Sequence, residues 1–150
     1  MSNFEITTPT HPPLTGSMNA QVYEGNELSN GIIRTDVDWS VRVHWELKGA
    51  LVPCICGFWC LHVYLESIGP GPELKLPHPH EIHIPLDPCG DGKYWYDFKV
   101  PAGTVSADHC STPYKVVVAL TYKTPAPCKD PGPMAGFCEL PILQFYESKK

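Results

Sequence analysis

Apolar and polar side chains alternate regularly between residues 33 and 47. Every odd-numbered position there except Thr35 is apolar, and the even-numbered positions carry Arg, Asp, Ser, His or Glu. Successive side chains of a β-strand point to opposite faces, so a period of two predicts a strand with one buried and one solvated face. A strand over residues 32–48 would exceed the usual length at ~3.3 Å per residue, which predicts a bend or bulge at residues 35–38.

Six further stretches share this alternation and are separated by turn-rich segments. Proline, at 17 of 150 residues, gathers in those segments, where its missing N–H costs no hydrogen bond of a strand or helix. No long segment has a helical period. These features predict an all-β fold, an antiparallel sandwich of about seven strands, because each strand has one apolar face to bury. The expected strands cover residues 18–23, 32–48, 54–67, 81–86, 93–100, 114–123 and 137–146.

The chain is expected to form a single β-sandwich domain over residues 18–150, preceded by a flexible arm over residues 1–17. The arm is rich in Thr and Pro and has little periodicity, which is typical of an unpacked terminus. At 150 residues the chain is long enough to bury a core without disulfide or metal support.

Residues 114–118, which read Tyr-Lys-Val-Val-Val, follow a loop that contains Asp108. Together with about seven strands over this length, the segment resembles the penultimate strand of an immunoglobulin-like sandwich. In that architecture a Tyr near the strand start hydrogen-bonds back to the preceding corner. Val116 stands where antibody-type domains have a Cys. The resemblance implies an architecture and no particular activity.

Charge and hydropathy exclude several kinds of partner. The chain has 11 Lys and Arg against 16 Asp and Glu, a net charge of -5, and its only basic run is Lys149-Lys150. Without a basic cluster we expect neither nucleic acid nor an anionic membrane surface as a partner. Residues 49–65 lack charged side chains, but Pro53, Gly57 and His62 interrupt them, so a buried strand explains this stretch better than a membrane span.

The start of the chain lacks the basic and apolar stretches of a secretory signal, so we expect a cytoplasmic protein. Seven cysteines, an odd number, then predict reduced thiols that pack as small buried side chains. The alternative is a disulfide framework, which would leave one thiol unpaired.

Cysteine and histidine gather on the stretch over residues 54–67. Cys54, Cys56, Cys60 and His62 have even numbers, so on one continuous strand all four would project from the same face. Thiolate and imidazole are the usual ligands of Zn²⁺ and Cu(I), which makes a metal site one interpretation. Cys54 and His62 would lie ~26 Å apart along a strand, so one ion would take a pair with ligands from a neighbouring strand. The other interpretation is that these side chains are small fillers under a covering layer, with no cofactor bound.

A second group of histidines follows a Pro- and Gly-rich loop. His78, His80 and His83 lie within six residues, which favours metal capture, although Pro79 stiffens the loop. His80 and Ile82 share strand parity, which puts His83 on the opposite face. An exposed, solvated loop is the alternative interpretation.

No motif predicts catalysis. The chain has no phosphate-binding glycine loop, no nucleophile elbow and no paired-carboxylate motif. Its Pro-locked glycine turns do not suit the wrapping of a phosphate by backbone N–H groups. We therefore expect a protein that is not an enzyme.

The outward face of the 54–67 strand stays apolar and is the best candidate for a binding surface. If the 114–123 strand lies alongside, the two form a contiguous apolar patch, which usually marks an interface. We expect this patch to bind a protein partner or a second copy of the chain, giving a homodimer. The alternative is that the arm or a Pro-rich loop folds back over it. The candidate interface residues are Phe58, Cys60, His62, Tyr64, Val117 and Ala119.

Overall fold

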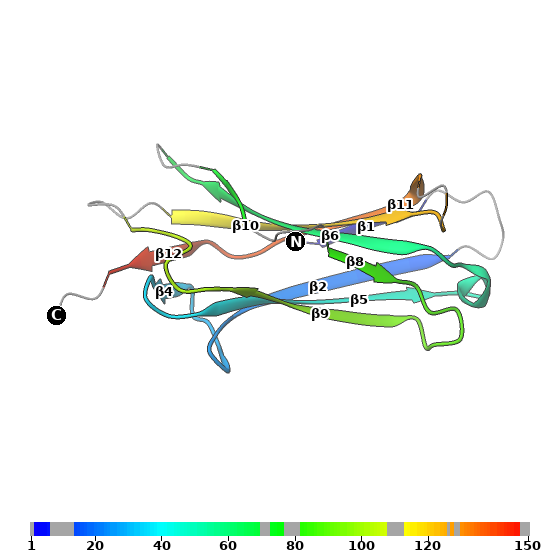
Figure 1. The fold of residues 1–150 in the computed structure, drawn as a ribbon, viewed down its shortest axis with the longest axis horizontal. Helices are drawn as coiled ribbons and strands as arrows, with labels where there is room; N and C mark the ends of the chain where they lie inside the picture. Colours follow the sequence, from blue (N-terminus) through cyan, green and yellow to red (C-terminus); the bar gives the residue numbers. More distant parts are fainter. Residues whose placement is uncertain are drawn as a thin grey trace.

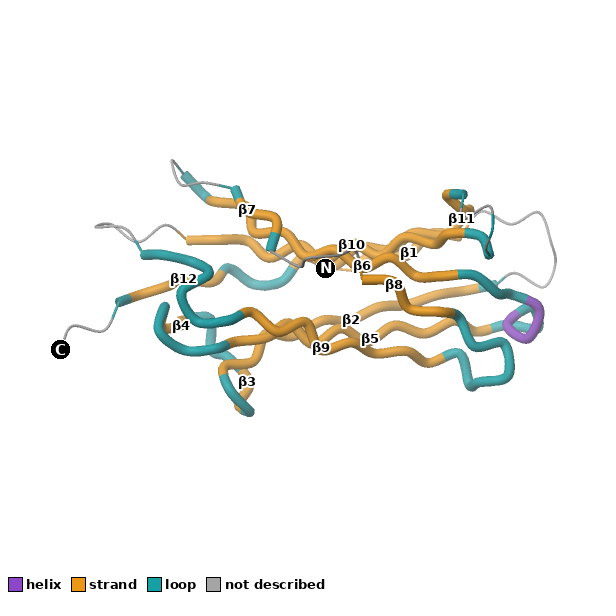
Figure 2. Tube along the Cα trace, viewed as in Figure 1, coloured by secondary structure: helices purple, strands orange, loops and turns teal. Residues whose placement is uncertain are grey.

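The chain folds into two β-sheets that lie face to face (Figure 1 and Figure 2), with the apolar side chains between them. The structure, a computed structural model, describes residues 2–6, 14–69, 73–76, 82–107, 113–125, 127 and 130–147. The one helix in these ranges is the short 3-10 turn η1 (Val52–Cys54). No helix among them has the length and apolarity that a membrane crossing needs. The predicted all-β sandwich is confirmed.

Sheet A is the larger sheet. Its main part runs from β1 (Ser2–Ile6) through β11 (Pro131–Glu139) and β10 (Pro113–Lys123) to β6 (Phe58–Ser67). The far edge of β6 pairs with two short strands, β7 (Leu74–Lys75) and β8 (Ile82–Pro85). The start of β10 pairs with β12 (Leu143–Tyr146), which pairs in turn with β4 (Ile32–Arg34).

Sheet B has the strand order β3 (Glu27–Leu28), β2 (Thr15–Glu24), β5 (Trp39–Lys48) and β9 (Lys93–Val100). The pairing of β4 with β12 is parallel, and the other pairings of the described strands are antiparallel. The described residues form twelve strands rather than about seven. The excess comes from short strands such as β3 and β7, which have too few residues to show a period.

The predicted break in the first alternating stretch is the point where the chain changes sheets. β4 belongs to sheet A and β5 to sheet B, and residues 35–38 connect them. Hydrogen bonds from the turn at residues 101–103 help to hold this crossing. The Gly103 N–H donates to the Thr35 carbonyl at 2.8 Å, and the Ala102 N–H donates to the Asp38 carboxylate at 2.7 Å.

The flexible arm expected over residues 1–17 is corrected for the residues described there. Residues 2–6 form β1, and β2 begins at Thr15. The Phe4 ring orders this segment, because it packs edge to face on Trp59 at 6.0 Å and lies against Gly16 and Gly136. A side chain at either glycine would overlap the ring. β1 therefore extends sheet A at its edge.

The strand expected over residues 54–67 begins only at Phe58, because the residues before it form a turn. Gly57 enters β6 with a φ of 135°, which L side chains rarely adopt. The Tyr122 hydroxyl donates a hydrogen bond of 2.5 Å to the Cys56 carbonyl, and a side chain at residue 57 would overlap the Lys123 carbonyl. The turn is thus fixed by β10 from outside.

Trp59 lies at the centre of the core and is fully buried. Its ring meets Phe4 and Tyr122 from sheet A and Trp45 and Tyr94 from sheet B, with ring centroids 6.0 to 6.2 Å apart. Edge-to-face pairs of this kind contribute ~0.5–1.5 kcal/mol each beyond the area they bury. The aromatic cluster therefore joins the two sheets.

Replacing Tyr122 by Phe tests the hydrogen bond that holds the turn before β6. The variant loses this partly buried bond and gains no new one. We expect its free energy of unfolding at neutral pH to fall by about 1 kcal/mol. Urea denaturation of both proteins measures the difference.

The pH dependence of stability gives a second test. Burial raises the pKa of the Tyr122 phenol above its ordinary value of 10.0, and the neighbouring Cys56 thiol adds to the shift. A phenol with a higher pKa in the folded chain stabilises the fold below the unfolded pKa and loses this contribution as the pH rises through the folded pKa. Above about pH 10 the wild type should therefore lose stability more steeply than Tyr122→Phe. Parallel stability curves would contradict this account.

Candidate interaction surface

β6 and β10 lie side by side in sheet A, as the predicted patch requires. Their register pairs His62 with Ala119 and Tyr64 with Val117, so these side chains project from the same face. The odd-numbered residues of β6 from Trp59 onward point into the core, which leaves the even-numbered ones outside. The outer face of sheet A includes Phe58, Cys60, His62, Tyr64, Val117, Ala119 and Phe137. The same register also places Glu66, Lys115, Thr121, Lys123 and Glu139 on it.

Ring contacts organise this face. The His62 and Tyr64 rings stack at 6.1 Å with an interplanar angle of 25°, and the Lys75 ammonium lies 6.0 Å from the Tyr64 ring centroid. Phe58 meets the His83 ring of β8 at 6.4 Å. The row of side chains along β6 is therefore held by contacts within the sheet.

The structure changes the role of one predicted residue and adds another. Cys60 lies between Thr121 of β10 and His83 of β8 and is only 1% exposed. A partner could therefore not contact its side chain directly. Phe137 of β11 is 41% exposed and lies opposite Ala119. The alternation around Phe137 could predict which face of the sheet this residue occupies. It could not predict that Phe137 lies beside Ala119, because that depends on a long-range strand pairing.

The arm and the Pro-rich loop were the two segments that could fold over this face. Where the structure describes them, they lie beside the face and not over it. β1 pairs with β11 in the plane of sheet A, so residues 2–6 extend the sheet. β7 likewise pairs along the edge of β6. Residues 7–13, 70–72 and 77–81, which complete the arm and the Pro-rich loop, lie outside the described residues.

The four-residue metal constellation does not form. Cys54 lies in η1 and Cys56 in the turn after it, and both are exposed. The prediction that they share a face with Cys60 and His62 is wrong, because the chain turns before β6 begins.

One pairing of metal-ligand types survives. His83 lies directly opposite Cys60 in the register of β6 and β8. His78 and His80 lie outside the described residues. Within the described ranges, no three His, Cys, Asp or Glu side chains gather closely enough to hold a metal ion.

Tyr114, the residue on which the immunoglobulin-like resemblance rests, lies near the start of β10. It is enclosed in the core and packs edge to face on Phe145 of β12 at 5.8 Å. Val116 is also buried. Asp108, which the motif would add, lies outside the described residues.

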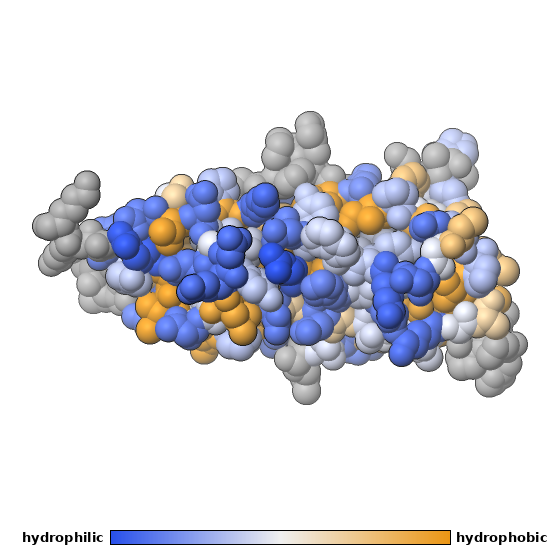
Figure 3. All heavy atoms as spheres, turned by 90° about the horizontal axis from the view of Figure 1, so that it is seen from below, coloured by the Kyte–Doolittle hydropathy of each residue, from blue (hydrophilic) through white to orange (hydrophobic). Residues whose placement is uncertain are grey.

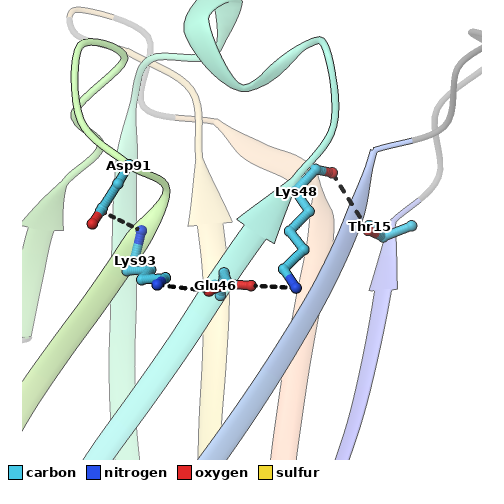
Figure 4. A network of polar contacts seen from close by, with 5 residues as sticks. All are labelled: Thr15, Glu46, Lys48, Asp91 and Lys93. Atoms are coloured by element: carbon cyan, nitrogen blue, oxygen red, sulfur yellow. Dashed lines mark hydrogen bonds and ion pairs between the residues drawn. The ribbon is translucent and has the colours of Figure 1, made fainter.

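The outer face of sheet B is polar by contrast, and hydrophilic residues cover much of it in Figure 3. At one end Glu46 lies between two ammonium groups, 3.1 Å from Lys48 and 4.0 Å from Lys93 (Figure 4). The Lys93 N–H donates to Asp91, and the Thr15 hydroxyl donates to the Lys48 carbonyl. Exposed ion pairs of this kind add little stability and keep the surface solvated.

Comparison with models of known protein families and with curated proteins finds no match to this chain.

The reactivity of the cysteines tests their placement. We expect iodoacetamide to alkylate Cys54, Cys56 and Cys89 in the native protein well before Cys60 and Cys138, because the first three are exposed and the last two buried. Burial also raises the pKa of the Cys138 thiol, which reduces its reactive thiolate. Mass spectrometry of peptides after timed labelling measures the order. Denatured protein is the control, and equal rates in the native protein would contradict the placement.

Proposed function

We propose that the protein is a non-catalytic assembly module that forms a homodimer through the outer face of sheet A. The observation that carries the proposal is the adjacency of Tyr64, Val117, Ala119 and Phe137, which β6, β10 and β11 present on one face. Phe137 is 41% exposed at one side of this group, where water contacts its ring. Contiguous apolar surface of this kind usually marks an interface.

Contacts within sheet A order several side chains of the face before a partner binds. The stacked rings of His62 and Tyr64 and the Phe58–His83 contact restrict side-chain rotation before any partner arrives. Ordering a side chain on binding costs ~0.5–1.5 kcal/mol, so prior order favours association.

Charges of both signs surround the face, which suits a second copy of the same chain. Lys115 and Glu139 form an ion pair at 3.7 Å, with Glu66 and Lys75 nearby on β6 and β7. A two-fold axis brings the same patch of each subunit together, so a rim with both signs can match itself.

We further propose that the sandwich is immunoglobulin-like. The parallel pairing of β4 with β12 supports this. β4 comes between two strands of sheet B along the chain, but it pairs with the last strand of sheet A. A further hallmark of that architecture is a buried Trp on a central strand. Trp59 of β6 is such a residue. We also propose a cytoplasmic location, which the thiols of Cys54, Cys56, Cys89 and Cys138 support.

Charge introduced into the face tests the homodimer. Phe58→Asp and Phe137→Asp each place an unpaired carboxylate in the proposed desolvated contact. We expect each variant to raise the dimer dissociation constant at least about a hundredfold, because an unpaired buried charge costs ~3 kcal/mol or more. Light scattering after size exclusion, over a concentration series, measures the mass.

Trp95→Asp is the matched control, since it makes the same change at an exposed aromatic residue of sheet B. It should remain dimeric, and circular dichroism should show a folded sandwich in all three variants. A monomeric wild type, or dimers that survive both substitutions on sheet A, would overturn the proposal.

A metal-binding sandwich is the second candidate, and the register of Cys60 with His83 favours it. Zn²⁺ or Cu(I) held there would take further ligands beyond this pair. The proposal predicts metal that co-purifies with the protein and is lost in Cys60→Ser and His83→Ala alike. Elemental analysis of untagged protein tests it, and metal-free wild type would exclude it.

A further inference from the structure

The outer face of sheet B is a regular array of side chains from β2, β5 and β9. The register sets them in four rows, each with one residue from each strand. The strands are antiparallel and the rows alternate with core rows, so all twelve side chains face outward. The rows are Ser17, Glu46 and Lys93; then Asn19, His44 and Trp95; then Gln21, Arg42 and Asp97; then Tyr23, Ser40 and Lys99.

Trp95 departs from the chemistry of its neighbours. Its indole is 65% exposed, more than any other large apolar side chain in the described residues. Every side chain around it in the array is polar or charged. An exposed indole loses the favourable burial that a Trp otherwise gains, which makes its place on a wet sheet face notable.

Two hollows open on this face near the row of Trp95. One, of about 450 Å³, is lined by Ser40, Arg42, Asp97 and Lys99 together with the turn at residues 25–26. The other, of about 350 Å³, is lined by Asn19, His44, Glu46 and Lys93 among others. Trp95 itself lines neither hollow, but its two neighbours on β9, Lys93 and Asp97, line one hollow each.

Arg42 and Asp97 lie close together in the larger hollow, but no hydrogen bond joins them. The Arg42 guanidinium lies 4.3 Å from the Tyr23 ring centroid and 3.9 Å from an Asp97 oxygen, too far for a hydrogen bond. The other Asp97 oxygen is buried and has no hydrogen-bond partner within the described part of the chain. Ser40 is only 7% exposed at the floor. A buried acceptor without a donor is costly, so a ligand hydroxyl there would be stabilised.

We propose that this face binds a neutral carbohydrate, with one sugar ring on the Trp95 indole and neighbouring hydroxyls in the two hollows. A sugar ring offers apolar C–H groups on its face and hydroxyl groups at its edge, which match an aromatic platform between polar recesses. Hydroxyls also donate and accept, so they can satisfy the Asp97 oxygen and the Arg42 guanidinium together.

The charges of the face favour a neutral ligand. The larger hollow has Arg42 and Lys99 against Asp38 and Asp97, and the smaller one has Lys93 against Glu46. Balanced signs give no net attraction for a polyanion such as a nucleic acid. A protein interface would need a contiguous apolar core, whereas the aromatic ring here is isolated among polar groups.

Affinity electrophoresis tests the proposal with four neutral polysaccharides in the gel: soluble starch, hydroxyethylcellulose, xylan and galactomannan. We expect at least one to retard the wild-type protein. Trp95→Ala should weaken that binding about tenfold or more through loss of the aromatic platform, and Asp97→Ala should weaken it through loss of the buried acceptor. Tyr146→Ala, which removes an exposed aromatic side chain from the other sheet, should bind like wild type.

Three results would overturn the carbohydrate site. They are no retardation by any of the four polysaccharides, undiminished retardation of Trp95→Ala, and binding to heparin alone that salt abolishes. A change in oligomeric state in Trp95→Ala would instead assign the indole to a protein interface. Because the homodimer is proposed on the other sheet, either proposal can fail while the other stands.

Discussion

The burial of Trp59 between the two sheets is the interaction on which the rest of the structure depends. Its ring contacts come from four other strands, two in each sheet, so the indole fixes the sheets against each other. Phe4 belongs to this cluster, which is why the first residues form an edge strand. Tyr122 belongs to it as well and also holds the turn that starts β6. The packing of one side chain thereby sets both a sheet edge and a strand boundary.

Local periodicity was sufficient for the fold class and for the facing of most strand residues. The alternation after residue 32 predicted one long strand with a bend or bulge at 35–38, and the structure divides it there into β4 and β5. It could not give the partner of each strand. That Phe137 lies beside Ala119, or His83 beside Cys60, follows from pairings between residues far apart in the sequence.

The errors in the sequence prediction have the same cause. Cys54 and Cys56 continue the parity of β6 by position alone, while a hydrogen bond from Tyr122, 66 residues away, keeps them in a turn. Phe4 stands in a segment too short to show a period, and the glycines that accommodate its ring lie on two other strands. The pattern reports what a segment prefers, and long-range contacts decide where that preference ends.

A sandwich core constrains only the inward half of each strand, which leaves the outward half free to differ between the sheets. On β6 the outward side chains include three aromatic rings, of which His62 and Tyr64 stack on each other, so they offer a surface that an apolar partner can cover. On β9 the outward side chains are Lys, Trp, Asp and Lys, so the single indole is separated from other apolar groups. The edge position of β9 adds a reason for this difference, because lysines on an edge strand oppose pairing with another chain. The edge of sheet B resists strand pairing, and its outer face has a single exposed indole among polar groups. This combination suits a small polar ligand better than a second sheet.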